Sequence, residues 1–174
     1  MRRLFLLRHA KSSWQTEGQD DFDRPLSARG RKGAPVMGAF LRDNDVAPDL
    51  ILCSTARRAR ETLALVLPFL RGEATIQLED RLYLASAAKL FARLKQLDGA
   101  WRQVMIVAHN PGLQDLTMML SAENENGNRH AIDGKFPTGA LVQFDFQIAG
   151  WSSLTRHGGQ LTRLVTPRSL AADL

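Results

Sequence analysis

Residues 4–9 read Leu4-Phe5-Leu6-Leu7-Arg8-His9, and this stretch decides how the rest of the chain is organised. Four apolar residues in a row, stopped by a basic pair, predict a short strand that is buried on both faces of a sheet. In open α/β sheets, ligands bind at the edge where the strands have their carboxyl ends. Arg8 and His9 are therefore expected at that edge, where an arginine beside a histidine indicates a phosphate pocket.

Two further apolar runs end in the same way. Residues 49–53 lead into Ser54-Thr55 and a helix predicted from about Ala56 to Leu70, and residues 104–107 lead into Ala108-His109. A strand, a short turn and a helix in that order form half of a βαβ unit. Because the carboxyl ends of parallel strands lie side by side, the three strand ends are expected to meet in one pocket.

The residues at these three strand ends suit a phosphoryl group. Arg8 and Arg58 offer planar, paired donors to its oxygens, and a neutral imidazole, from His9 or His109, can attack phosphorus in line. Nearby cations disfavour the imidazolium form, so the two arginines are expected to help keep the attacking nitrogen free. A helix beginning after Ser54-Thr55 would add backbone donors.

The remaining pattern predicts a three-layer α/β/α domain over residues 1–174, with a mainly parallel sheet and an antiparallel edge. The predicted elements are a helix capped by Ser27 and running to about Arg42, a strand at 74–78, helices at 85–97 and 113–120, and strands at 140–146 and 161–165. Pro35 conflicts with the first helix and predicts a kink or a later start. The alternation in 140–146 predicts one polar face, and Gly158-Gly159 predicts a closing antiparallel hairpin.

Composition limits the classes of protein that this chain can represent. Apolar residues make up 44% and charged residues 24% of its 174 residues, as in ordinary soluble globular proteins. The net charge of +5 comes from scattered Lys and Arg, which favours a solvated surface with a local cationic pocket over nucleic-acid binding. Cys53 is the single cysteine, so an internal disulfide and a Cys-rich metal site are excluded, and its apolar surroundings predict a buried structural thiol.

The amino terminus does not predict a targeting segment. Met1-Arg2-Arg3 and the leucines after it resemble the start of a signal peptide, but the apolar stretch is too short and lacks a cleavage site. No apolar run approaches the ~20 residues that a membrane span needs. A cytoplasmic location, without membrane association, is therefore expected.

Three motifs resemble those of a known family. Leu7-Arg8-His9-Ala10 is similar to the Arg-His-Gly signature of the histidine phosphatase superfamily, the phosphoglycerate mutase-like proteins, with Ala10 in place of the usual glycine. Residues 54–62 resemble its second signature and identify Arg58, rather than Arg57, as the phosphate-binding arginine. Residues 107–112, Val-Ala-His-Asn-Pro-Gly, resemble the third. The short chain, residues 24–30 and the His-Asn-Pro-Gly form of the third motif are similar to the SixA-like branch, the phosphohistidine phosphatases.

The resemblance implies a two-step phosphoryl transfer. His9 would attack phosphorus to give a phosphohistidine enzyme intermediate, and water would then release phosphate. Arg8, Arg58 and His109 would bind the equatorial oxygens, and Gln15 and the backbone amide of Asn110 are further candidates for phosphate contacts. The resemblance implies no metal and no organic cofactor.

The chain departs from the family at the proton donor. Many members carry a glutamate near the position of Tyr83 and Leu84, and neither of these residues is a carboxylic acid. Glu79, Asp80, Asp21 and Asp23 are the open alternatives, together with a site that has no proton donor. An imidazole leaves more readily than an alkoxide and needs less help from an acid, so the departure favours a phosphohistidine substrate.

Three functions are consistent with these motifs. The first is a phosphatase acting on a histidine-phosphorylated protein or another phosphate-containing substrate, and the second is a small-molecule phosphomonoesterase or mutase. A non-catalytic phosphate-binding module is the third, although pure binding would not require His9. Arg156-His157-Gly158 reproduces the first signature more literally, but its polar surroundings indicate a coincidental loop. Residues 121–134 are expected to form a loop, and the sequence does not indicate whether it covers the pocket.

Overall fold

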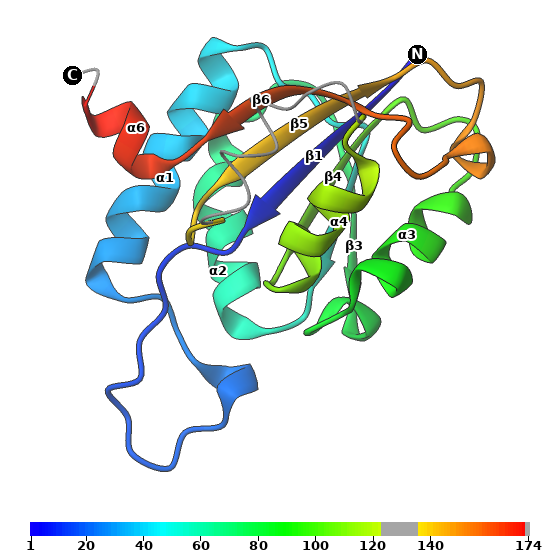
Figure 1. Cartoon of the computed structure of the whole chain (residues 1–174). Helices are drawn as coiled ribbons and strands as arrows, with labels where there is room; N and C mark the ends of the chain where they lie inside the picture. The colour runs from blue at the N-terminus through cyan, green and yellow to red at the C-terminus, as the bar shows by residue number, and fades with distance from the viewer. Residues whose placement is uncertain (123–135, 173–174) are drawn as a thin grey trace.

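A computed structural model describes residues 1–122 and 136–172, and this part of the chain contains one mixed sheet between two layers of helices (Figure 1). The strand order is β3-β2-β4-β1-β5-β6. The strands are β1 (Arg2–Arg8), β2 (Leu50–Ser54), β3 (Thr75–Glu79), β4 (Gln103–Ala108), β5 (Leu141–Phe146) and β6 (Gln160–Val165). The first four pair in parallel, whereas β5 runs antiparallel to both β1 and β6, which confirms the predicted mainly parallel sheet with an antiparallel edge.

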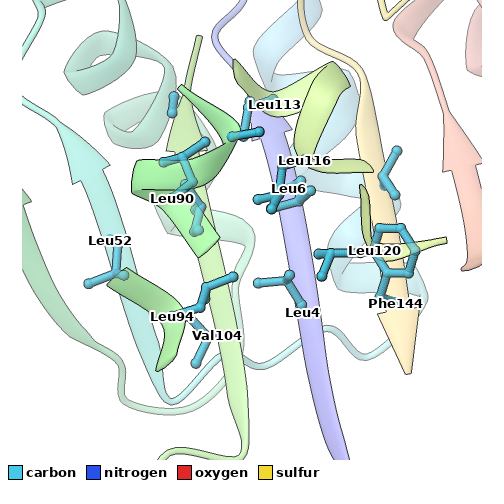
Figure 2. Packing of buried hydrophobic residues seen from close by; sticks show 14 of the residues in the cluster. Leu4, Leu6, Leu52, Leu90, Leu94, Val104, Leu113, Leu116, Leu120 and Phe144 are labelled. Atoms are coloured by element: carbon cyan, nitrogen blue, oxygen red, sulfur yellow. The ribbon is translucent and has the colours of Figure 1, made fainter. Parts of the chain in front are cut away.

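Strand β1 lies in the interior of the sheet and is buried on both faces. Leu4 and Leu6 belong to the apolar cluster on the face covered by α3 (Ala87–Lys95) and α4 (Gly112–Leu120), as Figure 2 shows. Phe5 and Leu7 belong to the cluster on the opposite face, with α1 (Ala28–Asp43) and α2 (Arg57–Val66). Successive side chains of a strand point to opposite faces, so a continuous apolar run supplies both layers of the core.

Local signals explain where the helices begin and end. Ser27 caps α1, because its Oγ accepts a hydrogen bond of 3.1 Å from the Gly30 amide. The helix begins at Ala28 and continues through Pro35, so a later start does not occur. Helix α2 ends at Val66, earlier than predicted, and a 3-10 turn at Leu67–Phe69 follows. Pro68 in this turn has no amide hydrogen to continue the helix. The last helix is α6 (Pro167–Ala172).

The alternation in the fifth strand puts Gln143 and Asp145 on one face, as predicted, but that face is largely covered by protein. Every residue of β5 except Asp145 is buried, and Gln143 is only 6% exposed. The two polar side chains satisfy each other at 3.4 Å, and Asp145 also pairs with Arg3 at 2.8 Å. Because their polar atoms have partners within the sheet, this face can be covered by protein instead of water.

Two smaller expectations are also settled by the fold. Cys53 is fully buried, and burial raises the pKa of its thiol to about 12, which confirms a structural cysteine. No helix among the described residues is long and apolar enough to cross a membrane.

Candidate active site

The end of β1 brings His9 to the carboxyl edge of the sheet. His9 is 5% exposed, and its ring Nδ1 lies 2.7 Å from the carbonyl oxygen of Ala10. A carbonyl can only accept, so Nδ1 carries the hydrogen and Nε2 is left as an acceptor. Arg58 Nε donates to this Nε2 at 3.3 Å. The unprotonated nitrogen of His9 therefore faces the guanidinium of Arg58.

The second histidine comes from the end of the neighbouring strand β4. The rings of His109 and His9 lie with centroids 5.3 Å apart, and His109 Nε2 is 2.7 Å from the hydroxyl oxygen of Ser54 at the end of β2. In the sheet, β2, β4 and β1 are neighbours in that order. The expectation that three strand ends meet at one point is thereby confirmed.

Both histidines are neutral near pH 7. Burial lowers the pKa of His9 to about 3, with the Ala10 hydrogen bond opposing the shift and His109, Arg58 and Arg8 adding to it. Burial and then the charge of Arg58 lower the pKa of His109 to about 3. The two arginines contribute as predicted, but the loss of water around the imidazoles is the larger cause.

Arg58 lines the pocket and its neighbour Arg57 does not. Arg58 is 2% exposed and donates through Nη1 to the Asp21 carbonyl at 2.6 Å and through Nη2 to the Asp21 carboxylate at 3.1 Å. Arg57 is exposed and pairs with Glu61 at 2.7 Å. The choice of Arg58 from the motif spacing therefore agrees with the geometry.

These side chains line a pocket of about 410 Å³. Of the residues predicted for the site, the lining includes Arg8, His9, Arg58, His109 and Asn110. Arg8 Nη1 and Asn110 Nδ2 both donate to the Phe136 carbonyl, at 2.7 Å and 3.0 Å. Gln15 is exposed and is not among the lining residues, so the structure does not bring this predicted contact to the pocket.

The loop between β1 and α1 brings Asp21, one of the four candidate proton donors, to the pocket. The Asp21 carboxylate accepts hydrogen bonds from Arg58, from Arg24 Nε at 3.0 Å and from the Tyr83 hydroxyl at 2.5 Å. The Tyr83 ring also meets the His109 ring edge-on, with centroids 5.5 Å apart. The Arg24 guanidinium lies 3.7 Å above the ring of Trp14, which is 67% exposed at the pocket rim.

Of the four candidate proton donors, one lines the pocket and three do not. Glu79 is held by Arg81 and Arg93, and Asp80 accepts a hydrogen bond of 2.6 Å from the Thr55 hydroxyl. Neither of them lines the pocket, nor does Asp23, whereas Asp21 does. Burial raises the pKa of Asp21, but the Tyr83 hydrogen bond and the charge of Arg58 outweigh it, and the net shift is downward.

The other predictions about polar residues concern regions away from the pocket. His157, in the literal Arg-His-Gly tripeptide, lies in a turn where its Nδ1 is 3.1 Å from the Ser121 carbonyl oxygen. From residue 123 onward, the loop predicted at 121–134 lies outside the described residues. Within the described ranges, no cluster of three or more His, Cys, Asp or Glu could hold a metal ion.

Comparisons with known proteins agree with this geometry. Residues 4–83 match the model of the histidine phosphatase superfamily (branch 1). An uncharacterized protein of Mycobacterium leprae is 33% identical over 167 residues, which are 93% of this chain and all of that protein.

Solved structures show the same likeness. A candidate phosphohistidine phosphatase SixA from Agrobacterium tumefaciens is 29% identical with a TM-score of 0.79, over 95% of this chain and 98% of that one. Its counterpart from Nakamurella multipartita is 25% identical with a TM-score of 0.82, over 95% and 96% of the two chains. The α-ribazole phosphatase of Shigella flexneri, 19% identical over 95% and 96% with a TM-score of 0.68, shares the fold. Together with the three motifs, these matches show that the chain belongs to the histidine phosphatase superfamily and has a SixA-like structure.

Proposed function

We propose that this protein is a phosphatase that removes the phosphoryl group from a histidine-phosphorylated protein. The observation that carries the proposal is the contact between the neutral, buried His9 and Arg58, because it places an unprotonated nitrogen beside a phosphate-binding cation. A nucleophile next to a fixed cation can attack a phosphoryl group that the cation has already oriented.

The reaction proceeds in two displacements. His9 Nε2 forms a bond to phosphorus while the bond from phosphorus to the substrate imidazole breaks, and the departing imidazole nitrogen takes up a proton from solvent. Water then attacks phosphorus and gives up a proton to solvent, the bond to His9 breaks, and phosphate leaves. Arg8, Arg58 and His109 stabilise the equatorial oxygens in both steps, and Asn110 adds a donor at the same wall of the pocket.

The surroundings of Asp21 support phosphohistidine as the substrate class. A carboxylate whose pKa is lowered, and which already accepts three hydrogen bonds, is a poor proton donor near pH 7. Asp21 instead orients Arg58 and Arg24. A site without a protonated carboxyl suits an imidazole leaving group, which departs more readily than an alkoxide.

A small-molecule phosphatase is the second candidate. The shared fold with an α-ribazole phosphatase favours it. The rim of the pocket favours a protein substrate, since Trp14 and Leu84 are 67% and 54% exposed there and offer apolar surface to a docked chain.

Phosphate release from three substrates distinguishes these candidates. The substrates are a phosphohistidine peptide, a phosphoserine peptide and a sugar phosphate, each tested with the wild type, His9→Ala and the remote His157→Ala. We expect rapid release from the phosphohistidine peptide by the wild type and His157→Ala, and none by His9→Ala. Comparable turnover of the phosphoserine peptide or the sugar phosphate would contradict the substrate class, and an active His9→Ala would contradict the nucleophile.

A further inference from the structure

A second concavity lies beside the active-site pocket, between α1, α6 and the segment that precedes β5. It measures about 730 Å³. Its larger apolar lining residues are half-buried, namely Val36 on α1, Pro137, Leu164 and Pro167. Figure 1 shows α6 beside α1, at the side of the sheet formed by β5 and β6. We call this concavity the α1–α6 groove.

The groove is continuous with the active-site pocket. Lys11 and Thr138 line both cavities. The backbone of Lys11 is fixed there, because its carbonyl accepts hydrogen bonds from the Ser27 amide at 2.8 Å and hydroxyl at 3.1 Å. On the other side, Gly139 donates to the His9 carbonyl at 2.9 Å. A chain lying in the groove would therefore reach the entrance of the pocket that contains His9.

The rim of the groove is cationic. Lys11, Arg29, Lys32 and Arg168 line it and are exposed, and no acidic residue is among the lining that the described residues provide. Among the described residues, none of these four side chains forms an ion pair with a carboxylate. Positive charge around an apolar surface is complementary to a segment that is acidic on one side and apolar on the other.

We propose that the α1–α6 groove docks an acidic, amphipathic segment of the histidine-phosphorylated substrate protein, which delivers its phosphohistidine to the adjacent pocket. This inference rests on the proposed function, and it adds a recognition surface outside the catalytic residues. The apolar side of the segment covers Val36, Leu164 and Pro167, and its carboxylates face Lys32 and Arg168. Rim charges of this kind act mainly on the rate of association and on its salt dependence.

Two phosphohistidine peptides of equal length and apolar pattern test the groove. One carries Glu and the other Lys at the polar positions, and phosphoimidazole serves as the small substrate. We expect kcat/KM of the wild type to be at least about tenfold higher for the acidic peptide, with the preference shrinking as salt is raised. Equal kcat/KM for the two peptides would overturn the proposal.

Substitutions in the groove test whether the preference for the acidic peptide arises there. Lys32→Glu/Arg168→Glu reverses two charges at the rim of the groove and changes no residue that lines the active-site pocket. Gly33→Leu adds a large side chain to the lining of the groove. A Cβ at Gly33 meets Pro167 at 3.8 Å, which is ordinary contact, so the helix tolerates the substitution. Both variants should raise KM for the acidic peptide about tenfold and leave phosphoimidazole turnover unchanged. The control, Lys89→Glu/Lys95→Glu on α3, makes the same charge change on the opposite face of the sheet and should leave that KM unchanged.

A binding measurement that requires no catalysis tests the groove independently of the proposed function. Fluorescence anisotropy with the labelled, unphosphorylated acidic peptide reports docking even if no phosphate is released. Binding that is lost in Lys32→Glu/Arg168→Glu and retained in the control supports the groove, whatever the catalytic result. Equal loss in the control would overturn it. Failure of the peptide to bind, with groove-dependent binding to vesicles of anionic phosphatidylglycerol or to single-stranded RNA, would overturn it in favour of a membrane or nucleic acid partner.

Discussion

Arg57 and Arg58 are adjacent in sequence and identical in chemistry, yet their surroundings give them different tasks. Arg57 lies on the surface with Glu61, and Arg58 is 2% exposed between His9 and Asp21. A guanidinium presents several donors in a fixed plane, and an ammonium does not. The bond to His9 and the two bonds to Asp21 can therefore be made together only by an arginine.

Arg58→Lys should lower kcat by about 100-fold, because one point charge cannot reproduce the planar donors that stabilise the transferring phosphoryl group. Arg57→Lys, one residue away, should stay within about twofold of the wild type, as expected for an exposed ion pair. Steady-state kinetics with a phosphohistidine peptide measure both. Similar losses in the two variants would contradict the assignment of Arg58.

Asp21 places a negative charge at the pocket where, on the proposed function, a phosphate dianion binds. Asp21→Asn removes this charge and keeps an acceptor for Tyr83 and Arg58. Inorganic phosphate should then inhibit about fivefold more strongly, because a like charge has been removed beside the anion. Competitive inhibition constants for Asp21→Asn and for Asp23→Asn, which is outside the pocket lining, provide the comparison. Weaker inhibition in Asp21→Asn would contradict this expectation. It would mean that Asp21 affects phosphate binding more by orienting Arg58 than by repelling the anion.

At the scale of elements, one hydroxyl joins the end of β1 to α2. Thr62 is 1% exposed, and its Oγ1 accepts from the Ala10 amide at 2.9 Å and donates to the Arg58 carbonyl at 2.7 Å. The residue after the candidate nucleophile His9 is thereby linked to α2, the helix that carries Arg58. The link joins the two segments whose side chains, 49 positions apart, meet in the pocket.

Thr62→Val should lower the free energy of unfolding by about 1–3 kcal/mol, since it leaves the buried Ala10 amide without an acceptor. Thr117→Val is the matched control. Thr117 is equally buried, but among the described residues its hydroxyl only donates, to the Leu113 carbonyl within α4. Its removal leaves no amide there without an acceptor and should cost less. Urea unfolding gives both values. A larger loss in Thr117→Val would contradict this role of Thr62.

At the scale of the whole molecule, the burial of two neutral histidines makes stability depend on pH. Their pKa values are about 3 in the folded protein and 6.5 in the absence of the fold. The unfolded chain therefore binds protons first as the pH falls. The contribution of these neutral imidazoles to the free energy of unfolding is fully present above pH 6.5. It is lost as the pH falls from 6.5 through 3.

Between pH 6.5 and pH 4, the wild type should lose stability faster than His9→Gln/His109→Gln. The difference should approach roughly 1.4 kcal/mol per pH unit for each histidine. Urea unfolding at several pH values measures it, with His157→Gln, at an exposed histidine, as the control. Parallel pH curves for the wild type and the double variant would contradict the neutral state of the pair.

Local sequence patterns were sufficient to predict much of this fold. Apolar runs that stop at polar residues identified β1, β2 and β4, and Ser27 identified the start of α1. Burial of a strand and capping of a helix depend on residues within a few positions, so a sequence carries these signals directly. The same runs, together with the rule for parallel strands, predicted that His9, Arg58 and His109 would meet.

The sequence by itself therefore determined the α/β architecture, the three motifs and the residues around the candidate nucleophile. Only the tertiary structure decided which further residues border the pocket. It turned Gln15 away from the pocket, brought Asp21 to Tyr83, 62 positions later in the chain, and opened a groove where α6 meets α1. The physical reason is that these contacts join segments far apart in the chain. Their geometry depends on how the whole molecule packs, and no spacing within either segment encodes it.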